Sequence, residues 1–426
     1  MDAARGTQQT ATVPATTGAV VQLRDGLLLR QAIPSDLGQI GELLAERGEP
    51  DDAADHRLVV EDPDAGWESC AVVVDGDRVV STATLLDERL HLADVELPAG
   101  QVELVATARG YEGRGLVRAL MAWAHARSAD RGHVVQVMIG IPYFYRLFGY
   151  EYAIDIPPAL PVSDPPRSPG EGAAGPEGGG LRVAGRGDLA ALRTLQDDAQ
   201  AGFDVRMPHS PPRRRWLLDR TGTTTWMLDR AGTPVATART HAGEDELLVA
   251  EAAAVDAPAA EELLRRLAAL SPEARLRVVQ RTGTVTGDAW ALAADPERLA
   301  EQYYVRIPDP AILLDRIRPV LWNRLVAAGL DRSSGDVVLS TFRRHYRIPV
   351  EDDGLGTVET GGVMQAPGVA RGAGVAPDQL AAVIFGAGVI ESSRMRPDVY
   401  PGPDRERFDV LFPRVTADLL TYYLPY

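Results

Sequence analysis

The hydrophobic pattern of the chain changes its period several times after Gly26. GLLLRQAI has the apolar run of a strand, and helical spacing then joins Leu37, Ile40, Leu43 and Leu44. Two strand-like runs follow, AVVVDGDRVVSTATLL and QVELVATA, with Asp and Gly in their turns. Apolar residues line one helical face between positions 114 and 131, and HVVQVMIG reads as a further buried strand. This alternation predicts an α/β fold made of packed layers.

The pattern begins again after a stretch rich in Pro and Gly at residues 157–180. LRVAGRGDLAALRTLQ repeats LLRQAIPSDLGQIGELL, with Asp188 in the place of Asp36, and WMLDRAGTPVATAR parallels VVVDGDRVVSTAT. The repeat predicts a duplicated domain. The second copy is degenerate, because VDAPAAEELLRRL stands where the first copy enters its helix through a pair of glycines.

These patterns predict three domains in the 426 residues. A flexible tail at 1–26 precedes the first domain at 27–156, and a linker at 157–180 leads to the degenerate second domain at 181–302. The third domain, at 303–426, starts with an amphipathic helix that contains Ile312, Leu313, Ile317, Val320, Leu321 and Leu325. Strand-like runs such as DVVLSTFRRHYRI follow this helix.

Charge and composition exclude several classes of function. The chain has 60 acidic and 44 basic residues, and its net charge of -16 opposes affinity for nucleic acid or for an anionic membrane. No run of about 18 apolar residues is present, and the N-terminus has no apolar stretch of signal-peptide type, so we expect a cytoplasmic protein. Cys70 is the only cysteine, and the seven histidines show no ligand spacing, so we expect no metal site.

The segment VELVATARGYEGRGLVRALM predicts a strand that enters a helix through Gly113, Arg114 and Gly115. A helix N-terminus exposes unpaired N–H groups at the positive end of its dipole, and glycines let a phosphate come close to the backbone. An anion site is one interpretation of this segment. An ordinary turn between a strand and a helix is the other.

A second segment, GIPYFYRLFGYEYA, joins Tyr145 to a following Phe-Gly-Tyr. A tyrosine is protonated near neutral pH and can serve as a general acid for a leaving thiolate. Aromatic residues that follow one another are also typical of a core, and we expect Phe144 and Phe148 to be core residues.

Taken together, the two segments resemble the pyrophosphate loop and the catalytic-tyrosine segment of the GNAT acetyltransferase superfamily. The order of an acetyltransferase domain, a degenerate second copy and a C-terminal domain similar to sterol carrier protein resembles the enhanced intracellular survival (Eis) group, over residues 27–426. The resemblance implies tandem GNAT domains of α/β class and an N-acetyltransferase that moves an acetyl group from acetyl-CoA to a primary amine by direct attack. It also implies a homo-oligomer, a hexamer if the chain is Eis-like.

The resemblance assigns roles to individual residues. A strand pairs with the pantetheine arm of acetyl-CoA through Leu104, Val105, Ala106 and Thr107. Backbone amides and basic side chains hold the pyrophosphate through Glu112, Gly113, Arg114, Gly115, Leu116, Val117 and Arg118. Tyr145 matches the general acid, the terminal carboxylate of Tyr426 matches the general base, and Glu103 is the alternative base. Glu112 departs from the family pattern, which has Arg or Gln there, so its charge would repel a diphosphate unless it points away or pairs with Arg109 or Arg114.

Other interpretations remain open. A donor carried on the phosphopantetheine of an acyl carrier protein would need fewer diphosphate contacts, and a GNAT scaffold that binds a ligand without turnover is the alternative outside enzymes. Between positions 49 and 64 the carboxylates of Glu49, Asp51, Asp52, Asp55, Glu61, Asp62 and Asp64 suggest a cationic acceptor. A solvated acidic loop explains the same residues.

Overall fold

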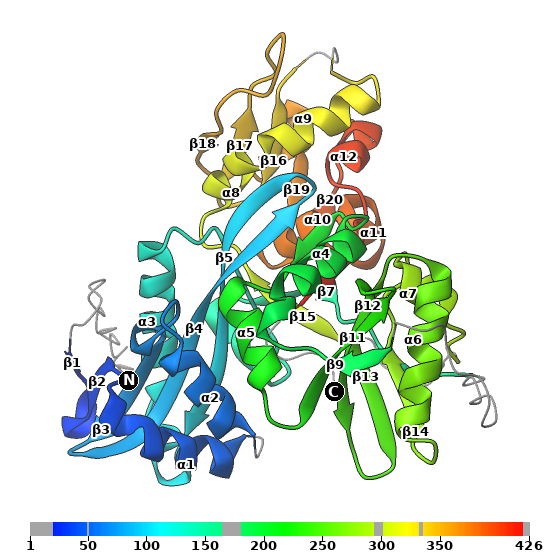
Figure 1. Cartoon of the computed structure of the whole chain (residues 1–426). Helices are drawn as coiled ribbons and strands as arrows, with labels where there is room; N and C mark the ends of the chain where they lie inside the picture. Colours follow the sequence, from blue (N-terminus) through cyan, green and yellow to red (C-terminus); the bar gives the residue numbers. More distant parts are fainter. Residues whose placement is uncertain (1–19, 49–50, 164–179, 294–300, 332–334, 421–426) are drawn as a thin grey trace. The chain divides into compact units, whose positions relative to one another are not determined.

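The computed structural model describes residues 20–48, 51–163, 180–293, 301–331 and 335–420. The chain forms two compact units, whose elements are labelled in Figure 1. Unit 1 contains residues 1–86 and 102–133, and unit 2 contains residues 87–101 and 134–426. Strands β4 (Arg78–Leu92) and β5 (Val95–Thr107) contribute to both units.

Unit 1 is a small sheet with helices. Its strands follow the order β1-β2-β3-β4-β5. The further elements are β1 (Val21–Gln22), β2 (Leu28–Gln31), α1 (Leu37–Arg47), α2 (Asp52–Glu61), β3 (Cys70–Asp75) and α3 (Leu116–Asp130). Buried side chains of β2 and β3 pack against Leu116 and Leu120 of α3, so this helix covers the sheet through its apolar face. The helices expected after positions 37 and 114 are confirmed.

The first sheet of unit 2 collects strands from distant parts of the sequence. It contains parts of β4 and β5 together with β6 (Val135–Met138), β7 (Glu151–Asp155), β10 (Val205–Met207), β15 (Gln302–Arg306) and β21 (Ala417–Leu419). Strand β15 lies between β6 and β7 and is antiparallel to both. Strand β10 pairs with β4 on one side and with β21 on the other. Residues from four separate regions therefore complete one sheet.

A second sheet has the order β8-β14-β13-β12-β11-β9. Its strands are β8 (Ala159–Pro161), β9 (Leu181–Val183), β11 (Thr223–Arg230), β12 (Thr233–Ala242), β13 (Glu246–Ala254) and β14 (Arg275–Val279). The helices of this part are α4 (Leu189–Gln200), α5 (Pro211–Asp219), α6 (Ala257–Leu270) and α7 (Val285–Ala289). Helix α6 lies along the sheet in Figure 1, and its apolar side chains share a core with β13.

The duplication inferred from the sequence is visible in hydrogen bonds. In the first copy Arg30 donates to both carboxylate oxygens of Asp36 at 2.6 and 2.9 Å, and the N–H of Ile33 donates to Asp36 at 2.9 Å. In the second copy Arg182 donates to both oxygens of Asp188 at 2.8 Å, and the N–H of Gly185 donates to Asp188 at 2.8 Å. Each clamp joins a strand to the 3-10 turn before a helix, so the two copies begin in the same way.

The copies differ where a strand leads into the next helix. Eight residues, 108–115, separate β5 from α3, whereas only Val255 and Asp256 separate β13 from α6. Asp256 caps α6, because its Oδ1 accepts the N–H of Ala259 at 2.7 Å. The second copy therefore has no long loop at this point, and a carboxylate occupies its helix N-terminus.

The C-terminal region has its own sheet, in the order β18-β17-β16-β19-β20. The strands are β16 (Val337–Ser340), β17 (His345–Ile348), β18 (Glu359–Gly361), β19 (Ala373–Val375) and β20 (Val399–Tyr400). The helices are α8 (Pro310–Arg316), α9 (Arg318–Ala327), α10 (Leu380–Phe385), α11 (Gly388–Met395) and α12 (Arg405–Leu411). Helices and sheets thus alternate throughout, and the α/β class is confirmed.

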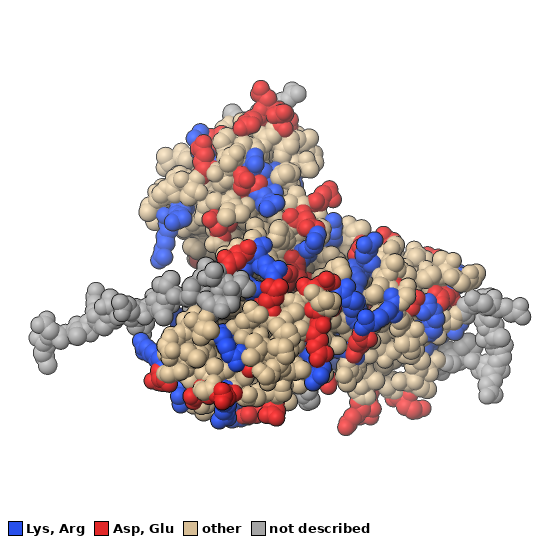
Figure 2. Space-filling view, turned by 60° about the vertical axis from the view of Figure 1, so that its left-hand side comes forward, with Lys and Arg blue, Asp and Glu red and all other residues tan. Residues whose placement is uncertain are grey.

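The surface mixes charges of both signs. Figure 2 shows acidic and basic side chains interspersed on one face of the molecule. Within the described ranges, no helix combines the length and apolar character that crossing a membrane requires.

A buried ion pair joins the first sheet of unit 2 to α5. Arg213 donates to the carboxylate of Glu88 and, at 3.3 Å, to the side chain of Gln101. The side chain of Arg213 is fully buried, and burial raises the pKa of Glu88 to about 7 despite the adjacent guanidinium.

We expect Arg213→Met to cost about 3–5 kcal/mol of stability, because it removes one partner of a buried pair. The loss of stability should be larger at about pH 8 than at about pH 5.5. Without Arg213 the buried carboxyl of Glu88 has a raised pKa in the folded state, and such a group makes the protein less stable as the pH rises. The double variant Glu88→Leu/Arg213→Met should recover most of the loss in thermal unfolding. A single variant as stable as the native protein would contradict this account.

Candidate active site

The loop from β5 to α3 forms an open helix N-terminus in unit 1. Gly113 and Gly115 have φ of +74° and +82°, the left-handed region that favours glycine. The first helical hydrogen bond runs from the N–H of Ala119 to the carbonyl of Gly115 at 3.1 Å, so the N–H groups before Ala119 have no acceptor within the helix. A Cβ at Gly113 or Gly115 would meet no atom within 4 Å. This geometry suits an anion that approaches the backbone.

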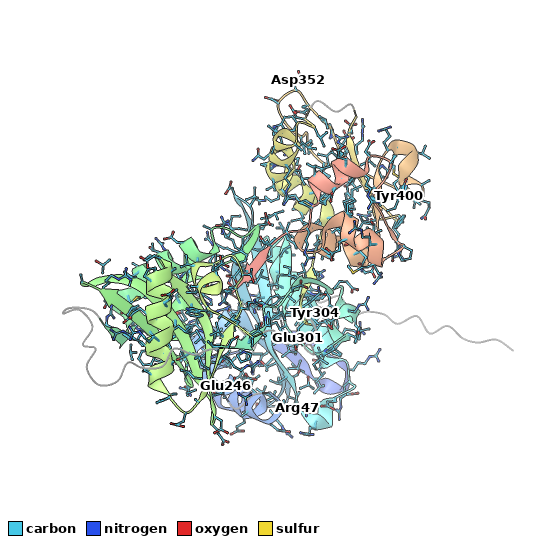
Figure 3. All side chains as sticks on the ribbon, turned by 90° about the vertical axis from the view of Figure 1, so that its right-hand side faces the viewer. Arg47, Glu246, Glu301, Tyr304, Asp352 and Tyr400 are labelled. Atoms are coloured by element: carbon cyan, nitrogen blue, oxygen red, sulfur yellow. The ribbon has the colours of Figure 1, made fainter. Side chains whose placement is uncertain are left out.

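Glu112, the departure from the family pattern, is neutralised by a residue that the sequence did not indicate. Its carboxylate forms an ion pair with Arg47 at the end of α1, labelled in Figure 3. The two partners proposed from sequence have other contacts. Arg109 lies 3.6 Å from Glu46, and Arg114 stacks over the ring of Tyr111 and donates to the carbonyl of Gly110 at 3.1 Å. The negative charge at the start of the loop is therefore compensated from α1.

Strand β5 changes its conformation just before the loop. Leu104 has φ of +52°, a left-handed value that interrupts the regular strand. Residues 99–101 of β5 pair in parallel with β6, and the candidate strand residues 104–107 follow this paired stretch. Glu103, which directly precedes Leu104, is 4% exposed, so its side chain is buried and not solvated.

Tyr145 lies in unit 2, in the 3-10 helix Phe144–Phe148, and is 6% exposed. Its ring packs edge-on against Phe144 at 5.1 Å and more obliquely against Phe148 at 6.3 Å between centroids. A Cβ at Gly140 would overlap the ring of Tyr145, so only glycine at that position leaves room for this ring. The tyrosine is thus fixed by its surroundings.

One neighbour of Tyr145 has no counterpart in the sequence motif. Tyr304 of β15 lies edge-on to Tyr145, with ring centroids 5.9 Å apart. It is more than 150 positions from Tyr145 in sequence, and it meets this ring because β15 enters the sheet between β6 and β7. The local sequence QYYVR predicts a strand but not its neighbours, so no motif could have found it.

The acidic segment after α1 is not a solvated loop. Residues 52–61 form helix α2, and three of the carboxyl side chains are buried, those of Asp52, Asp55 and Asp62. Its only histidine, His56, lies 3.3 Å from the thiol of Cys70, and burial lowers the pKa of His56 to about 4. The interpretation as an exposed loop was therefore wrong.

Tyr426, the other candidate base, lies outside the described residues. The strand that precedes it is firmly held. Asp418 of β21 accepts a hydrogen bond from Nε of Arg281 at 2.8 Å and another from Gln200 at 2.9 Å. The N–H of Leu420 donates to the carbonyl of Met207 at 2.9 Å, so the chain is anchored up to this residue.

Residues 45–153 match the family model of the acetyltransferase (GNAT) domain. The chain therefore contains a GNAT acetyltransferase domain, and this domain holds the loop, strand β5 and Tyr145. Among the described residues, no group of three or more His, Cys, Asp or Glu side chains could hold a metal ion.

Solved structures share the fold over nearly the whole chain. A GCN5-related N-acetyltransferase from Kribbella flavida is 17% identical with a TM-score of 0.66, covering 93% of this chain and 98% of its own. A probable N-acyltransferase from Enterococcus faecalis is 13% identical with a TM-score of 0.68, and Eis1 from Mycobacterium abscessus is 14% identical with a TM-score of 0.60. Both alignments cover 93% of this chain and 100% of the other. No curated protein matches the chain.

Proposed function

We propose that the protein is an N-acyltransferase that moves an acetyl group from acetyl-CoA to a primary amine by direct attack. The observation that supports this most is the N-terminus of α3 within a GNAT domain, which follows two glycines of positive φ and a strand whose Leu104 has a left-handed φ. The amine nitrogen attacks the thioester carbonyl, the C–S bond breaks, and the thiolate leaves as coenzyme A after taking a proton.

In this proposal the donor lies along β5 and the loop. Residues 104–107 offer backbone groups to the pantetheine arm, and the amides of residues 112–118 bind the diphosphate. Arg114 and Arg118 add positive charge, while Arg47 keeps Glu112 from repelling the phosphates.

The second copy does not bind a donor in this proposal. Its strand β13 ends two residues before α6, and the carboxylate of Asp256 already accepts an N–H at the start of that helix. A diphosphate would meet a negative charge there instead of free amides. One donor site per chain is the consequence.

Tyr145 acts as the general acid in this proposal. Its neutral hydroxyl gives a proton to the thiolate of coenzyme A as the C–S bond breaks, and the surrounding rings keep it in place. Cysteine and lysine nucleophiles have no part, because Cys70 is buried with a pKa raised to about 11 and the sequence contains no lysine.

The base that removes the amine proton is either the terminal carboxylate of Tyr426 or the side chain of Glu103. Six residues follow the anchored Leu420 and could extend by about 20 Å at most. Glu103 is buried beside the interruption of β5, in the first copy itself.

We also propose that the chain is of the Eis type, with a C-terminal domain similar to sterol carrier protein. A homo-oligomer, a cytoplasmic location and a small cationic acceptor are part of this proposal. The overlap with Eis1 over 93% of the chain and the separate C-terminal sheet support it.

The direct test is thiol release from acetyl-CoA with a panel of amines, run beside an acetylated acyl carrier protein as donor. Release with acetyl-CoA and one class of amine is the expected result. Turnover with the carrier protein alone would favour the alternative donor, and no release with any donor would favour a binding protein.

The donor contacts give the next prediction. Arg47→Ala should weaken acetyl-CoA binding several-fold, because it exposes the charge of Glu112 beside the loop, whereas Glu112→Gln should bind at least as tightly as the native protein. Calorimetry measures both affinities. Because the pair is partly exposed, the difference should shrink as salt is added.

Tyr145→Phe keeps the packing of the ring and removes only the hydroxyl. Turnover should fall by about 10²-fold, the usual scale of general acid catalysis, while the affinity for acetyl-CoA should hardly change. Phe148→Leu provides a control for altered packing without loss of a proton donor. Native turnover in Tyr145→Phe would return this residue to a purely structural role.

A further experiment distinguishes the two candidate bases. If the Tyr426 carboxylate is the base, a short extension after Tyr426 should abolish turnover and leave donor binding intact, and Glu103→Gln should be mild. The reverse result, an active extended protein and an inactive Glu103→Gln variant, would assign the base to β5.

A further inference from the structure

The turn before Tyr145 is exposed and has a strained backbone. Ile141 and Tyr143 are 66% and 69% exposed, and Tyr143 has φ of +63°. A left-handed conformation costs a residue other than glycine roughly 1 kcal/mol or more, so this turn needs support from outside.

Two tyrosine hydroxyls supply that support. The N–H of Tyr143 donates to the hydroxyl of Tyr152 at 3.1 Å, and the hydroxyl of Tyr304 donates to the carbonyl of Ile141 at 3.1 Å. The two hydroxyls are hydrogen-bonded to one another at 2.7 Å. The pair of tyrosine hydroxyls thus binds one backbone N–H and one backbone carbonyl of the same turn.

The pair is itself well fixed. Tyr152 of β7 and Tyr304 of β15 are directly opposite in the antiparallel ladder, and their rings stack with centroids 4.3 Å apart. Burial and the hydrogen bond with Tyr152 raise the pKa of Tyr304 well above its usual range, so this hydroxyl stays protonated. Figure 3 labels Tyr304, which lies close to Glu301 along the chain.

Tyr304 also touches Tyr145 directly. Its ring lies edge-on to that of Tyr145, and a Cβ at Gly140 would overlap the same ring. One residue therefore contacts both the turn and the side chain that the turn leads to. Tyr152 stacks on Tyr304 and reaches the turn through its hydroxyl.

We propose that Tyr304 is a positioning residue for Tyr145, contributed by the segment that follows the second copy. Its hydroxyl, paired with that of Tyr152, holds the strained turn at 141–143, and its ring aligns the ring of Tyr145. This inference rests on the proposed function, because Tyr145 matters for catalysis only if it is the acid. In this way a residue from the C-terminal half of the chain positions the proposed general acid of the first domain.

Removing the hydroxyl of Tyr304 tests the proposal. Tyr304→Phe keeps the stacked ring and should lower kcat by about tenfold, since small misplacements of a reacting group are costly, with KM for acetyl-CoA unchanged. Tyr152→Phe should behave in the same way. Tyr346→Phe, which removes a buried hydroxyl in the C-terminal sheet, is the matched control and should keep native kcat.

A double-mutant cycle distinguishes positioning from general damage. Tyr304→Phe should lose its effect on kcat in a Tyr145→Phe background, because it acts only through the hydroxyl of Tyr145. An equal loss in both backgrounds, or native kcat in Tyr304→Phe, would overturn the positioning role while the acid role stands. If the single variant Tyr145→Phe keeps native kcat, Tyr145 is not the general acid. This result comes from the single variant alone, before the double variant is measured.

Discussion

The backbone N–H groups at the start of α3 precede the first hydrogen bond of their own helix, and the proposed chemistry depends on this. A helix must satisfy these groups with a cap, with water or with a ligand. In the first copy Gly115 offers no side chain, and Gly113 and Gly115 have positive φ, with no atom within 4 Å of where a Cβ would stand. In the second copy Asp256 supplies the cap within the protein. In the proposed function, the diphosphate therefore binds at this helix N-terminus in the first copy and not in the second.

The second determinant is long-range strand pairing. β15 enters the sheet between β6 and β7, and β21 joins it through β10, so residues late in the chain complete a sheet that starts in the first domain. Tyr304 reaches the ring of Tyr145 by this route. Such pairings close long loops in the chain, which costs entropy, and the buried pair of Glu88 and Arg213 shows that further specific contacts hold the same region together.

Local features were predictable from the sequence, and contacts between distant residues were not. Periodicity predicted α1 and α3, and the repeat of Asp36 at Asp188 corresponds to two equivalent clamps, in which Arg30 and Arg182 each donate to the aspartate. The glycines of the loop stand between a strand and a helix, as expected, whereas the 3-10 helix that carries Tyr145 was not predicted. Glu112 pairs with Arg47, and nothing in the sequence pattern around Arg47 predicts this contact. The acidic segment forms α2, and charge counting overlooked its buried residues, which are Asp52, Asp55, His56, Val59 and Val60.

Counting the acetyl-CoA bound per chain tests the central claim most directly. Equilibrium dialysis of the full chain should find one site, which Gly115→Asp should abolish by adding a charge and a strained side chain at the open helix N-terminus. Asp256→Ala should leave the count at one. Binding that survives in Gly115→Asp, or a site that depends on Asp256, would contradict the assignment of the donor to the first copy.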